Sequence, residues 1–222
     1  MESLYFPYGF EPELVSRIDK KPYGDIDVSF IGSLAVASGH LQRGRDLAAL
    51  CKQISVSCWL SQFPQTTMGL AKLYAGLLRA CEWKTAGRTL QMLPQLWTLM
   101  HRNRGELYGI EMLSALAASR ITVNVHIDVA GGEAANVRLF EATGVGTCLV
   151  TDWKPNLCEH FVPDKEVVTF RTAAEAAEKI RYLLTNETER AAIATRGQKR
   201  TLTSHSMQSR IAMLVEHLMQ RV

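Results

Sequence analysis

The chain has 222 residues, of which 47% are hydrophobic and 21% are charged, and its formal net charge is +3. This composition is ordinary for a globular protein of one or two domains, and so small a charge without a clustered basic stripe gives no support for nucleic-acid binding. No apolar run approaches the roughly 18 residues that cross a bilayer, and the cysteines show no CxxC spacing. We therefore expect a cytoplasmic protein without a transmembrane segment, a zinc site or a disulfide framework.

Predicted strands and helices alternate along most of the chain. Residues 1–22 are rich in aromatic residues and proline, and we expect them to lie across a surface, with a short helix from about Pro12. Apolar runs predict strands at 27–33, 54–60, 121–127, 147–151 and 166–170. Helical spacing predicts helices at 40–53, 68–100 with a break at Pro94, 106–120, 137–143, and three from Ala173 onward that divide near Asn186 and Ser204.

This order predicts the α/β class, with a Rossmann-like parallel sheet flanked by helices in a single domain over residues 1–222. The last helix, Met207 to Val222, is strongly amphipathic, and we expect it to pack across the domain's own sheet. In parallel sheets ligands bind beyond the carboxyl ends of the strands. The loops after Ile31, Ile127 and Thr151 all leave the sheet at that edge, so we expect the functional site there.

The stretch from Gly131 to Asp152, GGEAANVRLFEATGVGTCLVTD, is the most informative part of the chain. Gly131 and Gly132 permit a close approach of a ligand to the backbone before a short helix, although an ordinary loop has the same composition. Glu133 can accept hydrogen bonds from sugar hydroxyls or complement the helix dipole. Asn136 is a suitable N-cap residue, and Arg138 can hold a phosphate or lie on an exposed face.

Glu141 lies near the predicted carboxyl end of this helix, where the helix dipole disfavours a negative charge, and it follows two apolar residues. A carboxylate in such surroundings needs a compensating partner. The vicinal hydroxyls of a ribose would serve, since a carboxylate accepts two hydrogen bonds side by side. Exposure to solvent, or pairing with a core arginine, would serve equally well.

His126 ends a predicted strand and is either a satisfied structural histidine or a group that positions a ligand near its phosphate. The histidines are scattered and form no HxxxH pattern, so we expect no metal site.

Several motifs in order resemble retaining group 1 glycosyltransferases, most closely their spore-maturation-type branch. The branch pattern N-x-R-x-F-E followed by glycine is similar to Asn136, Arg138, Phe140, Glu141 and Gly144. Further similar segments are PYGFEP at 7–12, VSFIGS at 28–33, Tyr108-Gly109, and His205 with Arg210.

The resemblance implies one half of a GT-B fold, the C-terminal half that binds a nucleotide-diphosphate sugar. It implies that Glu141 holds the ribose and that Glu133 lies near the donor sugar as the catalytic-site residue. Gly32, Ser33 and Arg43 or Arg45 would meet the diphosphate, without a bound metal or further cofactor. Residues 1–22 would form an interdomain linker and residues 204–222 a crossover helix.

On this interpretation the acceptor-binding N-terminal half lies outside the chain or is supplied by a partner protein. We then expect the chain alone to bind the donor nucleotide without transferring sugar. The alternative is a non-catalytic module that binds a nucleotide or a protein on the same fold. A dehydrogenase is excluded because no GxGxxG follows the first strand.

Overall fold

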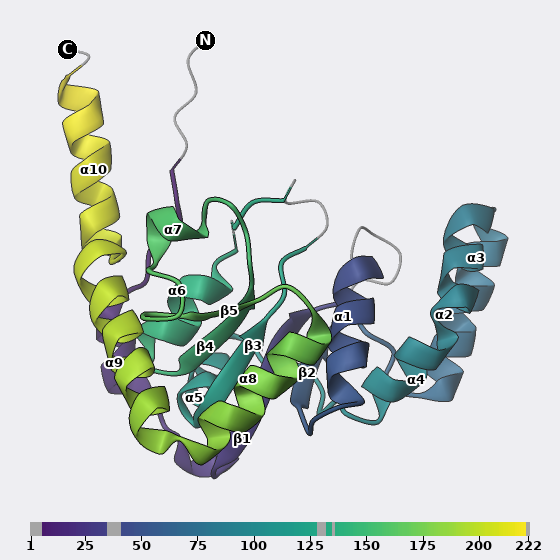
Figure 1. Cartoon of the computed structure of the whole chain (residues 1–222). Coiled ribbons are helices and arrows are strands. Elements are labelled where there is room, and N and C mark those ends of the chain that lie inside the picture. The colour runs from purple at the N-terminus through teal and green to yellow at the C-terminus, as the bar shows by residue number, and fades with distance from the viewer. Residues whose placement is uncertain (1–5, 35–40, 128–131, 135, 221–222) are drawn as a thin grey trace.

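A computed structural model describes residues 6–34, 41–127, 132–134 and 136–220 (Figure 1). Within them the strands are β1 Ile26–Ser33, β2 Ser57–Ser61, β3 Ser119–Asn124, β4 Cys148–Asp152 and β5 Val168–Phe170. The α-helices are α1 Leu41–Cys51, α2 Thr67–Arg79, α3 Trp83–Gln91, α4 Leu93–Met100, α5 Gly109–Ala117, α6 Arg138–Gly144, α7 Leu157–His160, α8 Ala173–Thr185, α9 Glu187–Ser204 and α10 Met207–Met219. Two 3-10 helices, η1 Pro12–Arg17 and η2 Lys21–Tyr23, precede β1.

The described strands form one parallel sheet in the order β2-β1-β3-β4-β5. Because every strand runs the same way, all their carboxyl ends lie at one edge. From β1 the chain adds β2 on one side of the sheet and then β3, β4 and β5 on the other, so the direction of strand addition reverses between β1 and β3. Open α/β sheets bind ligands at such a point. The predicted α/β class with a Rossmann-like parallel sheet flanked by helices is confirmed.

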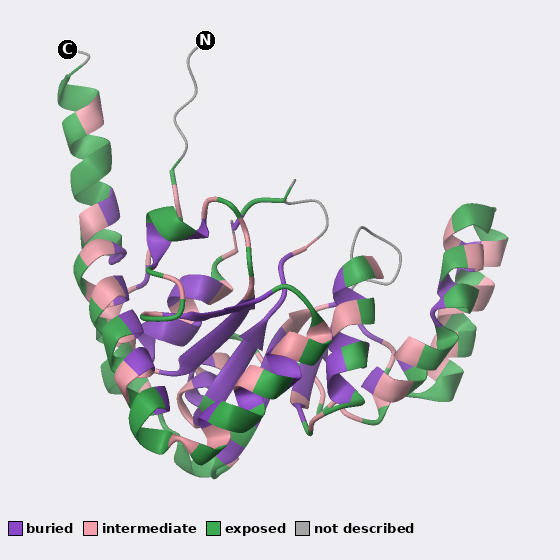
Figure 2. Ribbon diagram, viewed as in Figure 1, coloured by how far each residue is buried: buried purple, intermediate pink, exposed green. Residues whose placement is uncertain are grey.

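Helices cover both faces of the sheet, so most strand residues are buried (Figure 2). On one face, Phe30 and Val123 pack with Leu47 of α1 and Ile180 of α8. On the other face, Leu149 packs with residues of α5 and α6 such as Leu116 and Leu139. Alternate strand residues serve the two faces, as the two-residue repeat of a strand requires. Cys148, expected in the core, is fully buried.

The N-terminal segment lies across α6 and the start of α10. The Phe10 N–H donates to the His205 carbonyl at 2.8 Å, and the Phe10 carbonyl accepts from the Met207 N–H at 2.8 Å. A Cβ at Gly144 would come within 2.6 Å of the Phe10 ring, so glycine there lets the segment pack on the helix.

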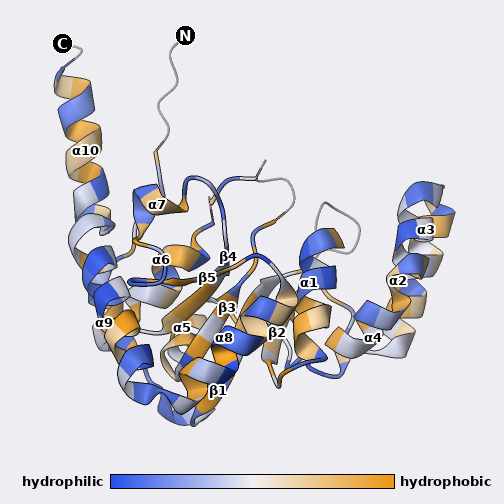
Figure 3. Ribbon diagram, in the orientation of Figure 1, coloured by the Kyte–Doolittle hydropathy of each residue, from blue (hydrophilic) through white to orange (hydrophobic). Residues whose placement is uncertain are grey.

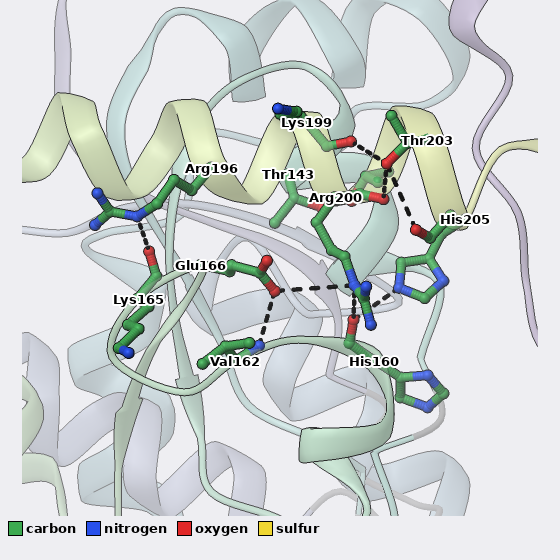
Figure 4. Close-up of polar contacts among 12 residues, drawn as sticks. Thr143, His160, Val162, Lys165, Glu166, Arg196, Lys199, Arg200, Thr203 and His205 are labelled. Atoms are coloured by element: carbon green, nitrogen blue, oxygen red, sulfur yellow. Dashed lines mark hydrogen bonds and ion pairs between the residues drawn. The ribbon is translucent and has the colours of Figure 1, made fainter.

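Helix α9 approaches the loop before β5 and ends beside α7 (Figure 4). Its backbone at Gly197 lies against the Glu166 carbonyl, leaving no room for a Cβ. The Arg200 Nε donates to the His160 carbonyl at 3.1 Å, and the His205 ring donates from Nε2 to the same carbonyl at 2.7 Å. These contacts join α9 and the turn after it to α7 and to the loop before β5.

Two parts of the fold differ from the expected helices. The segment predicted as one helix with a break at Pro94 forms α2, α3 and α4; Pro94 opens α4, but a second break occurs at Cys81, whose φ is +56°. Helix α10 does not pack across the sheet. It extends away from it with an apolar stripe on its surface, and of its described residues only Arg210 is buried (Figure 3). The amphipathic helix was predicted correctly, but the prediction that it packs on the sheet was wrong.

None of the helices in the described part combines the length and apolarity that a membrane span requires.

Candidate functional site

The candidate site lies at the carboxyl edge of the sheet, where polar side chains from β3, β4 and the loop before α6 meet. Asn124 ends β3, and its Nδ2 donates to the Thr151 Oγ1 of β4 at 2.9 Å. Asn136, in the loop, donates from Nδ2 to the Asn124 Oδ1 at 2.7 Å. The Asn136 Oδ1 is buried and has no hydrogen-bond partner among the described residues. The network therefore leaves one acceptor at the edge unused.

Asn136 is not the N-cap of α6, although its residue type made that a reasonable expectation. Val137 occupies the cap position without a side-chain hydrogen bond, and the Asn136 amide is directed to β3 instead. A tertiary hydrogen bond to a buried partner has displaced the local one.

The loop that carries Glu133 is fixed by Asn156, which follows β4. Asn156 accepts the Ala134 N–H at Oδ1, 2.7 Å away, and donates from Nδ2 to the Ala134 carbonyl at 3.3 Å. Gly132 has φ +91°, a conformation that favours glycine. Ala134 is buried while Glu133 is exposed, so the loop presents the Glu133 side chain outward. Gly131 lies outside the described residues.

Removing the Asn156 amide should loosen this loop. We expect Asn156→Ala to lower the free energy of unfolding by about 1 kcal/mol, because it removes the acceptor of the buried Ala134 N–H. Hydrogen exchange at the Ala134 amide should accelerate in the variant. Gln91→Ala, which changes an exposed amide at the end of α3, is the control and should alter neither quantity. Unchanged exchange at Ala134 would contradict the proposed clamp.

At the end of β1, Gly32 makes room for an arginine of α1. A Cβ on Gly32 would lie 2.6 Å from the Arg43 Nη2, and the Arg43 guanidinium carbon lies 5.1 Å from the centre of the Phe30 ring. The structure thus brings three predicted residues together at the carboxyl end of β1: Gly32, Ser33 and Arg43. Arg45 is exposed on α1, so of the two candidate arginines Arg43 is the one that reaches the strand.

Glu141 has a protein partner. The Arg138 Nη1 lies 2.7 Å from the Glu141 Oε2, and the two side chains are 13% and 20% exposed. The same Arg138 nitrogen lies 2.9 Å from the Met112 sulfur of α5. Pairing with an arginine was one of the alternatives left open by the sequence. Glu141 lies in the first turn of α6, so its predicted place near the carboxyl end of the helix was wrong.

The pair does not fully compensate for the burial of the carboxylate. Burial raises the pKa of Glu141 above its usual value, and the positive charge of Arg138 offsets only part of that increase. Burial also lowers the pKa of Arg138, against the opposing effect of Glu141. Glu141 could therefore still gain from additional hydrogen-bond donors.

His126 follows β3 and is fully buried, with its Nδ1 2.6 Å from the Asp152 Oδ1. The Lys154 Nζ lies 3.1 Å from the other Asp152 oxygen. Burial raises the pKa of Asp152, but the hydrogen bonds from His126 and the charge of Lys154 outweigh it, so the pKa lies below its usual value. Asp152 stays ionised near neutral pH.

Asp152, Lys154, Asn124 and Asn156 were not predicted as site residues. The sequence placed Asp152 directly after a strand at the ligand edge, which was the available signal. Within the described residues, no group of three or more His, Cys, Asp or Glu side chains is placed to hold a metal ion.

The sequence profile of the family described as Glycosyl transferase-like matches residues 59–216, more than two thirds of the chain. The chain belongs to this family. The matched region includes β3, β4 and the loop before α6, and so contains most of the candidate site of this glycosyl transferase-like protein. No curated protein sequence matches the chain.

Solved structures with this fold include several glycosyltransferases. Sucrose-phosphate synthase from Thermosynechococcus elongatus has a TM-score of 0.60 and 15% identity, over 98% of this chain and 53% of that protein. HepE from Anabaena in complex with UDP-glucose has a TM-score of 0.63 and 15% identity, over 96% of this chain and 56% of HepE. The C-terminal domain of the group 1 glycosyl transferase LpcC from Francisella tularensis has a TM-score of 0.51 and 13% identity, over 91% of this chain and 96% of that domain.

At these identities the similarity shows the fold alone. The chain spans about half the length of sucrose-phosphate synthase and of HepE, and nearly the whole of the LpcC domain.

Proposed function

We propose that this glycosyl transferase-like chain is the donor-binding half of a GT-B glycosyltransferase and binds a nucleotide-diphosphate sugar at the carboxyl edge of its sheet. The observation that carries the proposal is the convergence of Asn136, Asn124 and the His126–Asp152 pair at that edge. Ligands of open parallel sheets bind at this place. HepE, which has the same fold, binds UDP-glucose, and the LpcC domain that the chain matches almost end to end is a C-terminal domain.

Within this proposal Glu141 accepts hydrogen bonds from the ribose hydroxyls and Glu133 lies near the transferred sugar. Gly32, Ser33 and Arg43 meet the diphosphate, for which Arg138 and His126 are further contacts. Transfer would be of the retaining type and the protein would belong to the spore-maturation-type branch, as the motif around Asn136 suggests. The proposal includes a cytoplasmic location.

Exposed apolar surface supports the view that another half or a partner protein covers part of this domain. On α10, Ile211, Val215 and Leu218 are each more than half exposed. A groove of about 520 Å³ also opens between α2, α3 and α4, lined by Leu70, Tyr74, Leu90, Leu93 and Trp97. Contiguous apolar surfaces of this kind mark interaction sites.

A non-catalytic binding module is the second candidate, and the Arg138–Glu141 ion pair favours it. A carboxylate that already has a cationic partner at 2.7 Å has less need of a ribose. A donor-binding half binds a nucleoside diphosphate, whereas a module that binds only a partner protein does not.

A thermal-shift panel tests the proposal. The ligands are uridine, guanosine and adenosine diphosphates, their sugar conjugates and the three nucleosides. At least one diphosphate should raise the melting temperature, because a ligand at 100 times its dissociation constant stabilises the native state by about 2.7 kcal/mol. The nucleosides should give smaller shifts. A flat response to every nucleotide would reject the proposal and favour the non-catalytic protein-binding module.

A further inference from the structure

The His126 imidazole is held in one orientation by Asp152. Its Nδ1 lies 2.6 Å from the Asp152 Oδ1, and its backbone N–H donates to the same oxygen at 2.9 Å. Because the low pKa of Asp152 keeps the carboxylate ionised, the carboxylate can only accept, so the imidazole Nδ1 carries a proton whether or not Nε2 carries one too. The ring therefore directs Nε2 away from Asp152.

The Nε2 atom has no hydrogen-bond partner among the described residues, although the ring is fully buried. His205 offers a contrast, since its buried ring uses both nitrogens, Nε2 toward the His160 carbonyl and Nδ1 toward Arg210. Buried polar atoms are nearly always satisfied by protein, water or ligand. The unsatisfied nitrogen lies just beyond β3, at the ligand-binding edge of the sheet.

The surroundings of His126 favour an anion. The Lys154 Nζ lies 3.1 Å from the second Asp152 oxygen, and its side chain is 23% exposed, so the ammonium keeps further donors for a ligand. Asp152 is a single carboxylate between two groups that can carry positive charge. When the imidazole is protonated, the cluster is cationic and presents an N–H at Nε2.

We propose that the His126 Nε2–H donates a hydrogen bond to a phosphoryl oxygen of the bound diphosphate, with Asp152 and Lys154 as positioning residues. This inference rests on the proposed function and deepens it, because it names the atom of His126 that contacts the diphosphate and the two residues that position the ring. Asp152 fixes the ring and balances the imidazolium charge. Lys154 holds the other oxygen of Asp152 and so prevents the carboxylate from rotating.

A neutral imidazole with its proton on Nδ1 would instead offer a lone pair at Nε2 and accept a sugar hydroxyl. The two arrangements differ in ligand preference. A phosphate contact requires only the diphosphate, whereas a hydroxyl contact requires the sugar or ribose.

The test combines NMR of the ¹⁵N-histidine-labelled chain with affinity measurements. The probes are inorganic pyrophosphate, the nucleoside diphosphate that gives the largest thermal shift, and its nucleoside. Pyrophosphate should move the His126 Nε2 resonance of the wild type. His126→Gln should weaken binding of pyrophosphate and of the diphosphate about tenfold, the worth of one hydrogen bond to a charged group, and leave nucleoside affinity unchanged. Asp152→Asn should weaken the same two ligands. His101→Gln, an exposed histidine after α4, is the control and should change nothing.

The outcomes separate the inference from the proposed function. If a nucleoside diphosphate binds wild type and His126→Gln equally, the inference is wrong and the proposed function stands. If pyrophosphate moves the Nε2 resonance while every nucleotide fails to bind, the diphosphate contact stands and the nucleotide proposal fails. A resonance that responds only to ligands with a sugar or ribose overturns the phosphate contact. A resonance that responds to nothing overturns it too, and this wild-type measurement holds even if the variants do not fold.

Discussion

Replacing Glu141 with alanine is expected to lower the affinity for the bound nucleoside diphosphate about 100-fold, or about 2.7 kcal/mol. The variant would lose two hydrogen bonds from the ribose hydroxyls to an ionised acceptor, each of which contributes more than a neutral bond. The measurement is isothermal titration of the wild type and the variant with the diphosphate selected by the thermal panel.

The Arg138–Glu141 pair makes this a demanding test. The Arg138 Nη1 lies 2.7 Å from the Glu141 Oε2, but this buried oxygen has no hydrogen-bond partner among the described residues. Burial raises the pKa of the carboxyl despite the charge of Arg138, so the cost of burying it is not fully offset. If the pair is purely structural, Glu141→Ala and Arg138→Ala should both lower the stability of the free chain and leave nucleotide affinity unaltered. If Glu141 binds ribose, its removal should lower affinity by more than any change in stability explains.

A ligand lacking one hydroxyl separates the two roles. The 2′-deoxynucleoside diphosphate should bind the wild type more weakly than the ribose form, and the two should bind Glu141→Ala equally. Glu178→Ala, an exposed carboxylate on α8 at the opposite face of the sheet, is the matched control and should keep the wild-type preference. A full 2′-hydroxyl preference in Glu141→Ala would remove the residue from the ribose site.

The fold was largely predictable because alternating strands and helices leave strong local patterns. β3 and β4 are runs of β-branched and apolar residues, and α8 and α9 carry clear helical spacing. The ends of some elements differ from the predicted ones where tertiary contacts outweigh the local sequence pattern. For example, β3 ends at Asn124, although the apolar pattern of the sequence continues to residue 127. The break at Cys81 was not predictable, since a non-glycine residue at φ +56° has no sequence signal.

The sequence predicted where the candidate site lies in the fold, but it did not predict which side chains contact one another there. The alternation of strands and helices predicted that the loops after β3 and β4 leave the sheet at one edge, and the structure places His126 and Asn136 at that edge. Their partners lie far along the chain: Asp152 is 26 positions from His126, and Asn156 is 22 positions from Ala134. Pairings over such distances depend on side-chain directions at the sheet edge, which no local pattern encodes. The prediction that α10 packs on the sheet was wrong for a similar reason. An amphipathic pattern indicates that one face of a helix is covered, and it does not indicate which surface covers that face.

The buried His160–His205 cluster gives the chain a predictable sensitivity to acid. His205 accepts a hydrogen bond at Nδ1 from the Arg210 Nη2, 2.7 Å away, and Arg210 donates from Nε to the Tyr8 carbonyl at 3.0 Å. Burial and the nearby charge of Arg210 lower the pKa of His205 to about 4. The pKa of His160 is lowered as well, again mainly by burial. Protonating His205 would remove the acceptor for the Arg210 Nη2, on the same side chain that bonds the N-terminal segment at Tyr8.

Lowering the pH from about 6.5 to about 4 should therefore destabilise the fold by up to about 3 kcal/mol through His205. In this range the unfolded chain binds a proton at this histidine and the folded chain does not, so the free energy of unfolding falls as the pH falls. Above pH 6.5 the histidine is neutral in both states and contributes no dependence, and below about 4 the loss is complete. Urea unfolding at a series of pH values measures the effect.

Carboxylates also titrate between pH 6.5 and 4, so the contribution of His205 is isolated by comparing the wild type with a variant that lacks this histidine. His205→Gln should be less stable than the wild type at pH 7, because it loses a buried ring that contacts Phe140 and Phe161. Its stability should nevertheless fall less steeply between pH 6.5 and 4, since it cannot take up the proton. His101→Gln, at an exposed position, should keep the wild-type slope. Equal slopes for wild type and His205→Gln would show that folding does not lower the pKa of His205, and the hydrogen bond that its Nδ1 accepts from Arg210 would then have to be reassigned.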